Sequence, residues 1–80
     1  MNGLYRTSFL LNFGSRTNKY FQLLSEEDFD FKTKNIGIDI LKNDKNTVKV
    51  ELSCDSLIEL KIATTAVIKS LEIIEKTLNI

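Results

Sequence analysis

One short acidic segment holds the side chains with the most potential for chemistry. Its four carboxylates are Glu26, Glu27, Asp28 and Asp30. Carboxylates can act as general acids and bases or bind a metal ion, but specific chemistry needs a partner histidine, a phosphate-binding loop or a second carboxylate in an apolar pocket. The sequence contains no histidine. We therefore interpret this segment as a solvated connection anchored by two aromatic residues, Phe29 and Phe31.

Cys54 is the single cysteine, so the chain cannot form an internal disulfide. Without histidine, the usual Cys/His zinc ligands are also missing. A lone cysteine near a strand end is typical of a small buried residue in a reducing compartment. The three glycines, Gly3, Gly14 and Gly37, are too far apart to form a phosphate-cradling loop or an RNA-clamping GXXG loop. We predict a protein that is not an enzyme and uses no metal or cofactor.

Positive charge is concentrated near the N-terminus, although the whole chain is neutral with 11 basic and 11 acidic residues. Residues 1–24 contain Arg6, Arg16 and Lys19 but no acid. Such a patch can contact a phosphate backbone without reading its sequence. Scattered basic residues are equally ordinary on any protein surface. RNA contact through these three residues and an open sheet face is therefore an alternative hypothesis.

Three strands are predicted from alternating apolar residues. The alternation runs from Tyr5 to Phe13, with its aromatic side toward the core, and again from Val48 to Cys54. Between them, a change of phase near Lys34 requires a bulge or loop, so a further strand is expected from Lys34 or Asn35 to Leu41. The polar run at residues 42–46 predicts a hairpin, which makes the last two strands antiparallel.

A short helix is predicted over residues 16–24, with Ser15 as its N-cap. Its apolar face would contain Thr17, Tyr20, Phe21 and Leu24. With the long helix described next, the order is strand, helix, strand, strand, helix. This order predicts a single α+β domain over residues 1–80, in two layers, with a three-stranded antiparallel sheet and both helices on one face. The exposed edges of such a sheet invite strand addition.

The stretch from Asp55 to Ile80 predicts one long helix, against which the rest of the domain packs. Ser56 and Glu59 have the spacing of a capping box, in which each side chain bonds a backbone N–H of the first turn. At about 100° per residue, one broad stripe faces the sheet. Its members are Leu57, Leu60, Ala63, Thr64, Val67, Leu71, Ile74 and Leu78.

The same helix carries a second apolar strip on roughly its opposite side. This second strip consists of Ile58, Ile62, Ala66 and Ile73. A surface helix of a small domain needs only one apolar stripe. Either a neighbouring helix of the same chain covers the second strip, or another polypeptide does, since contiguous exposed apolar surface marks an interaction site.

Three segments together resemble the small dimerisation subunit of the KEOPS (EKC) complex, the Pcc family related to the CTAG antigens. They are Phe13-Gly14-Ser15 before the short helix, Leu23-Leu24-Ser25-Glu26-Glu27 at its end, and Leu52-Ser53-Cys54-Asp55 followed by Leu60-Lys61-Ile62-Ala63. The likeness covers almost the whole chain. Two positions depart from the family: Ser25 or Glu26 replaces a proline, and Lys61 replaces an arginine, whose planar multi-donor fork lysine cannot copy.

The resemblance implies a non-catalytic subunit of the machinery that makes threonylcarbamoyladenosine in tRNAs reading codons that begin with A. Two copies, or this chain and a paralogue, would associate. The helices would dock the ATP-binding catalytic subunit, and tRNA would be reached indirectly through the complex. The expected partner-binding residues are Ile58, Lys61, Ile62, Ala66, Lys69 and Ile73. With no signal-like segment and no apolar run of about 20 residues, we expect a cytoplasmic protein.

Overall fold

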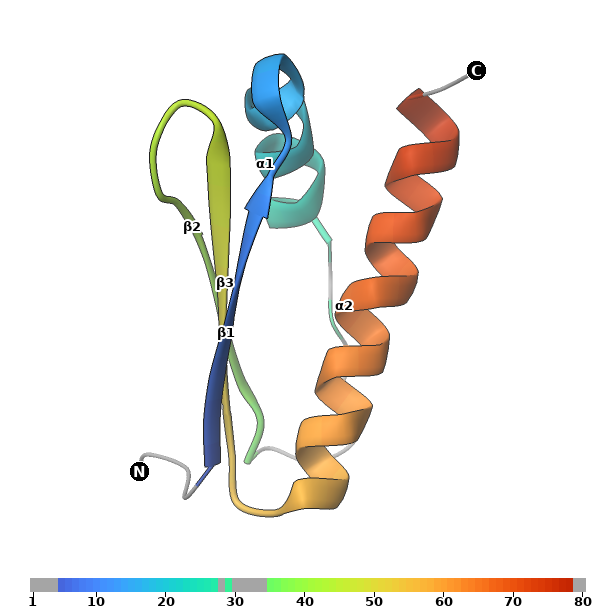
Figure 1. Ribbon diagram of the computed structural model, residues 1–80. Coiled ribbons are helices and arrows are strands. Elements are labelled where there is room, and N and C mark those ends of the chain that lie inside the picture. Colours follow the sequence, from blue (N-terminus) through green and yellow to red (C-terminus); the bar gives the residue numbers. More distant parts are fainter. Residues whose placement is uncertain (1–4, 28, 30–34, 79–80) are drawn as a thin grey trace.

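The computed structural model describes residues 5–27, 29 and 35–78. Within them, strands β1 (Tyr5–Asn12), β2 (Gly37–Lys42) and β3 (Thr47–Cys54) form one antiparallel sheet in the order β1-β3-β2 (Figure 1). The central strand pairs with both neighbours, so that Val50 lies opposite Phe9 on one side and Ile40 on the other. The predicted α+β class is confirmed.

Alternation along β3 separates the two faces of the sheet. Val48, Val50, Leu52 and Cys54 are buried beneath the helices, whereas the residues between them are half-buried on the other face. The edge strands bury their inward residues less, because each has a neighbour on one side only. Phe9 points into the core as predicted, but Tyr5 at the start of β1 is exposed.

β2 begins at Gly37, so the prediction of a start at Lys34 or Asn35 is wrong for Asn35. Lys34 lies outside the described residues, and Asn35 lies in a turn. The strand continues one residue beyond the predicted Leu41, because Lys42 still pairs with Val48. The predicted hairpin follows, where the Asn43 N–H donates to the Thr47 carbonyl at 3.0 Å and the Asn46 N–H donates to Asp44 Oδ1 at 2.8 Å. That last bond lowers the pKa of Asp44.

The connection from β1 to the first helix is a 3₁₀ turn, η1 (Gly14–Arg16), which leads into α1 (Thr17–Ser25). The prediction of Ser15 as N-cap is wrong, because Ser15 lies inside η1 and Arg16 occupies the cap position, where its side chain makes no capping hydrogen bond. Gly14 makes the bend at φ 58°, a region that favours glycine. The Thr17 hydroxyl then donates to the Gly14 carbonyl at 2.8 Å.

α1 lies on the helical side of the sheet and buries Thr17, Tyr20 and Leu24, while Phe21 is half-buried. The ring of Tyr20 stacks on Phe13 with centroids 3.9 Å apart, which joins α1 to the end of β1. Lys42 Nζ donates to Asn18 Oδ1 and joins the helix to β2.

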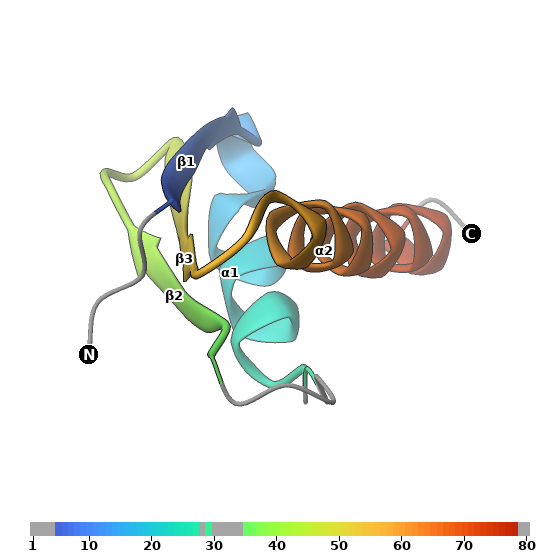
Figure 2. The same ribbon diagram turned by 90° about the horizontal axis from the view of Figure 1, so that it is seen from below.

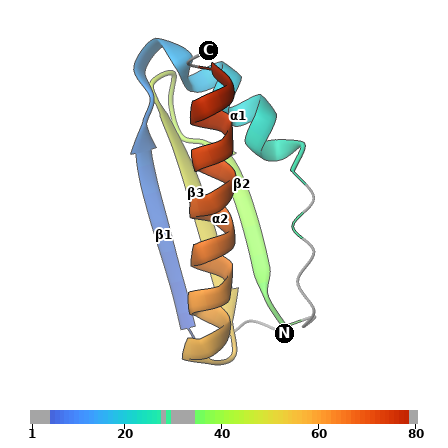
Figure 3. The ribbon, with the colours of Figure 1, turned by 90° about the vertical axis from the view of Figure 1, so that its right-hand side faces the viewer.

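α2 (Leu57–Leu78) covers the same face of the sheet as α1 (Figures 1 and 2). It runs along the sheet (Figure 3), and its C-terminal half tilts away from the strands, with α1 between α2 and the sheet (Figures 1 and 2). The core lies between the two layers. Its buried members are Tyr20, Leu24, Val48, Val50, Leu52, Ala63, Val67 and Ile74.

Candidate docking surface on the C-terminal helix

The first turn of α2 is fixed by a capping box. The Glu59 N–H donates to Ser56 Oγ at 3.2 Å, and Glu59 Oε1 in return accepts the Asp55 N–H at 3.1 Å. The carboxylate thus reaches one residue further back than in the standard motif, in which it would accept the N–H of Ser56. The predicted cap at Ser56 and Glu59 is confirmed, and it sets where the helix starts and which face it turns to the sheet.

The buried face of α2 is centred on Ala63, Val67, Ser70 and Ile74. Ser70 is the polar member of this buried face and is 5% exposed. Leu57 was predicted to face the core and is 62% exposed, so that prediction is wrong. Leu57 belongs to the first turn, which follows the end of β3 and therefore has little sheet beneath it.

The second strip faces solvent. Ile58 is 72%, Ile62 49% and Ile73 63% exposed, while Ala66 at the edge of the strip is half-buried. The interpretation that a helix of the same chain covers these isoleucines is wrong for the described residues, because α1 packs against the inward side of α2. Leu57 and Ile68 are also exposed and extend the apolar area around the helix.

Charged side chains accompany the isoleucines on the outer face of α2. Lys61 and Lys69, both expected to contact a partner, are exposed. Lys76 and Glu72 are exposed on the same face and were not singled out from the sequence. Both residues could have been assigned to this face from the sequence. Positions 58, 62, 65, 69, 72 and 76 recur every three or four residues, which is the spacing of one helical face. The outer face of α2 therefore alternates charged and apolar side chains, a pattern that a helix of another protein could pack against.

The open face of the sheet is a second surface, and it is mainly polar. It contains a hollow of about 370 Å³ lined by Arg6, Thr7, Ser8, Asp39, Glu51, Leu52 and Ser53. Lys49 forms an ion pair with Glu51 at 3.3 Å across this face. Leu10 and Leu41 are exposed on either side of Lys49, so this face also presents apolar side chains to solvent. Because both positive and negative side chains line the hollow, its electrostatic potential does not favour ligands of one charge.

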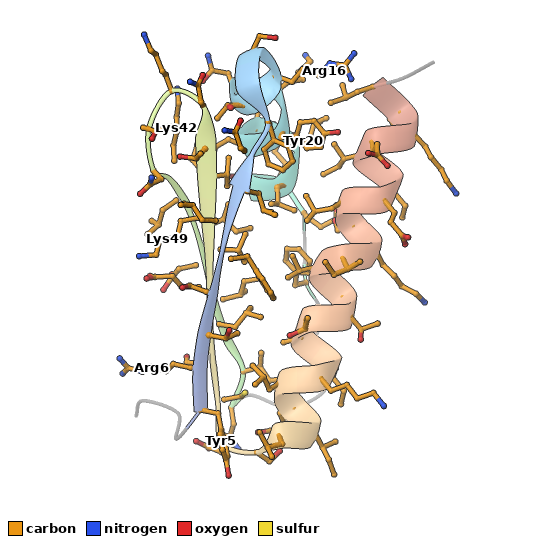
Figure 4. The ribbon with its side chains drawn as sticks, in the orientation of Figure 1. Tyr5, Arg6, Arg16, Tyr20, Lys42 and Lys49 are labelled. Carbon is orange, nitrogen blue, oxygen red and sulfur yellow. The ribbon has the colours of Figure 1, made fainter. Side chains whose placement is uncertain are left out.

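The three basic residues of the RNA hypothesis do not form one patch. All three are exposed. Arg6 points away from the helices near the start of β1, whereas Arg16 lies at the opposite end of the molecule, above α2 (Figure 4). Lys19 follows Arg16 by one turn on α1. Arg16 and Lys19 can therefore act together, and Arg6 cannot join them.

Of the residues with catalytic potential, the structure describes Cys54, Glu26 and Glu27. Cys54 is fully buried, its Sγ donates to the Ser56 carbonyl at 3.5 Å, and burial raises the pKa of its thiol. Glu26 and Glu27 are exposed, and Asp28, Asp30 and Phe31 lie outside the described residues. Phe29 packs against the core, which confirms it as an anchor. Among the residues that the structure covers, no three His, Cys, Asp or Glu side chains gather as metal ligands would.

The chain was compared with protein families, curated proteins and solved structures. No protein-family description, no curated protein and no solved structure matched it. A search of the described helices found none with the length and apolar character of a membrane span.

Proposed function

We propose that the chain is a non-catalytic assembly and dimerisation subunit of a KEOPS complex in the cytoplasm. In that role it supports the synthesis of threonylcarbamoyladenosine in tRNA by docking the ATP-binding catalytic subunit on α2. Two separate lines support the proposal. One is the likeness of its three sequence segments to the Pcc family, and the other is the exposed second strip of α2.

The exposure of Ile58, Ile62 and Ile73 carries the proposal. The core is already filled from the other side of the same helix, so these largely exposed side chains add little to the fold by burial. Complete burial of one isoleucine is worth about 1.5 to 3 kcal/mol. Covering three that are half to three-quarters exposed would stabilise a complex by a few kcal/mol, before the entropy lost on association is subtracted.

The mechanism is assembly by helix packing. Ala66 has a small side chain at the edge of the second strip, which lets a partner helix approach α2 closely. Lys61 and Lys69 on the same face would meet carboxylates of the partner. The capping box and the buried face hold α2 rigid, so the docking surface exists before the partner arrives.

The test replaces single isoleucines of the second strip with aspartate. Ile62→Asp and Ile73→Asp are each expected to change the free energy of unfolding by about 0.5 kcal/mol or less, as for other exposed positions. Each should abolish capture of the KEOPS catalytic subunit, because a charge replaces the apolar contact. Circular dichroism measures folding, and isothermal titration with the purified catalytic subunit measures capture.

Two matched variants complete the experiment. Leu10→Asp alters a side chain that is 63% exposed, as Ile73 is, but lies on the open sheet face, and it should leave capture unchanged. Ala63→Asp buries a charge beneath α2 and should destabilise the fold by about 3 kcal/mol or more. If both isoleucine variants unfold, or if the wild-type chain fails to bind the catalytic subunit, the proposal is wrong.

A further inference from the structure

The open face of the sheet holds two charged side chains of opposite sign that bond to nothing around them. Arg6 on β1 and Asp39 on β2 are both exposed, and neither side chain forms a hydrogen bond or an ion pair with any residue that the structure describes. The neighbouring charges, Lys49 and Glu51, already pair with each other. Arg6 and Asp39 both line the hollow of this face. The hollow therefore offers one positive and one negative group to a ligand.

Strand register places these two groups at diagonal corners of the hollow. The outward residues form two rows across the sheet, one of Arg6, Ser53 and Gly37 and the other of Ser8, Glu51 and Asp39. Strands lie about 4.8 Å apart and each residue advances about 3.3 Å, so the Cα atoms of Arg6 and Asp39 are on the order of 12 Å apart. Both side chains leave the same face of the sheet, and Arg6 points away from the helices (Figure 4). A small molecule lying along the diagonal can reach both.

Small residues keep the space between the two charges open. Gly37 has no side chain, and a Cβ placed there would lie 2.7 Å from Ser53 Oγ. Ser8 and Ser53 add only hydroxyl groups, which can bond a ligand. The volume of the hollow, about 370 Å³, is at the lower end of the range of about 300 to 1,000 Å³ for small-molecule sites. The space therefore fits a small ligand.

We propose that this hollow binds a free α-amino acid with an apolar side chain. The carboxylate of the ligand accepts two N–H bonds from the guanidinium of Arg6, the bidentate geometry that arginine favours. Its ammonium group donates to the carboxylate of Asp39. A simple anion would meet Asp39 and Glu51, and a simple cation would meet Arg6. The arrangement of charges thus selects a zwitterion over either.

The surroundings of the hollow favour this ligand over two other classes. None of the lining residues is aromatic, so a nucleobase would find no stacking partner. Among the described residues, no three carboxylate, thiol or imidazole groups gather as ligands of a metal ion. Leu10 and Leu41 are exposed in the next row of the face, beside the hollow. They supply an apolar surface for the side chain of the amino acid.

An NMR titration with L-leucine tests the site. Saturable shifts of the backbone amides around the hollow are expected, with a Kd of about 0.1 to 1 mM, because few contacts form on so open a surface. Leucine amide lacks the carboxylate and isocaproate lacks the ammonium group, so each should bind about tenfold more weakly or less. Glycine should also bind more weakly than leucine, since it has no side chain to cover the two leucines. The amides of α2, on the opposite face (Figures 1 and 2), should not shift.

Two variants assign the roles of the charges. Arg6→Gln should weaken leucine binding about tenfold and remove the preference for leucine over leucine amide. Asp39→Asn should weaken it by a similar factor and remove the preference over isocaproate. Lys45→Gln in the hairpin and Glu72→Gln on α2 are the matched controls and should bind leucine as the wild-type chain does.

Four results would each overturn the inference. They are the absence of saturable shifts, shifts centred away from the hollow, equal affinity for leucine and its two analogues, and undiminished binding by either hollow variant. Circular dichroism should show that all four variants fold, because each replaces an exposed charge with a neutral polar group. The site does not depend on the proposed function, since capture of the catalytic subunit is measured on α2. Failure of one therefore leaves the other standing.

Discussion

At the scale of single residues, the position of Cys54 shows how burial removes chemistry from a reactive side chain. The thiol lies at the end of β3, fully buried, and donates to the Ser56 carbonyl. Burial disfavours the thiolate and raises the pKa of Cys54, and the nearby Glu59 carboxylate adds to the shift. Because the thiolate is the nucleophile, the side chain behaves as a small apolar residue of the core.

Thiol labelling should therefore report on unfolding. We expect Ellman's reagent to leave Cys54 unmodified in the native chain and to modify it completely in concentrated urea. As pH rises, the unfolded chain loses the thiol proton first, since its pKa of about 8.5 lies below that of the folded chain. The contribution of Cys54 to stability is thus complete below that pH and declines above it. Rapid labelling of the folded protein at neutral pH would contradict this account.

At the scale of secondary structure elements, the start of α2 depends on one side-chain oxygen. Ser56 Oγ accepts the Glu59 N–H, and without it a first-turn donor loses its partner. We expect Ser56→Ala to lower the free energy of unfolding by about 1 kcal/mol. Ser56→Asp should retain most of the stability, because aspartate also caps well and its charge favours a helix N-terminus.

Urea denaturation monitored by circular dichroism measures this difference. The midpoint should fall for Ser56→Ala while the slope of the transition stays constant, since the same surface is exposed on unfolding. Equal stabilities of Ser56→Ala and the wild-type chain would show that the cap contributes nothing measurable.

Periodicity was sufficient to predict the order of the elements, because residues that alternate or recur every three to four positions follow the geometry of strands and helices directly. Periodicity did not predict two details that depend on how the chain bends and where the sheet ends. Ser15 has the side chain of an N-cap, but the bend at Gly14 places it inside a 3₁₀ turn. Leu57 has an apolar side chain, but its helical turn follows the end of the sheet.

The candidate docking surface was predicted from the sequence only in part. The second strip could be identified because its isoleucines share a helical face away from the main stripe. Whether α1 would cover it could not be decided from spacing, since that depends on how two helices pack on one small sheet. The structure answers this by exposing Ile58, Ile62 and Ile73. The identity of a partner depends on the surface of a second molecule, so it cannot be derived from the periodicity or burial of this chain alone.

At the scale of the whole molecule, the two-layer arrangement leaves two large outer surfaces with different characters. The outer face of α2 is apolar with interspersed lysines, and the open sheet face has a polar hollow and, beside it, two exposed leucines. Because the layers point these surfaces in opposite directions (Figures 1 and 2), a partner on α2 leaves the sheet face free. The two surfaces can therefore be occupied by different partners at the same time.

The distribution of positive charge over the molecule leads to a prediction about tRNA. Arg6 is separated from Arg16 by most of β1, a distance on the order of 20 Å at about 3.3 Å per residue. Charges this far apart act independently at physiological ionic strength, where the screening length is about 8 Å. Only Arg16 and Lys19 remain close enough to contact phosphates together.

We therefore expect the isolated chain to cause no electrophoretic shift of tRNA at moderate salt, because two cations without a stacking surface supply little affinity. If the chain does bind tRNA, the logarithm of the association constant should be plotted against the logarithm of the salt concentration. A slope of about −2 to −3 would indicate three phosphate contacts. Loss of that binding in an Arg16→Ala, Lys19→Ala double variant, with Lys45→Ala as the matched control, would favour the RNA-contacting alternative over a pure assembly subunit.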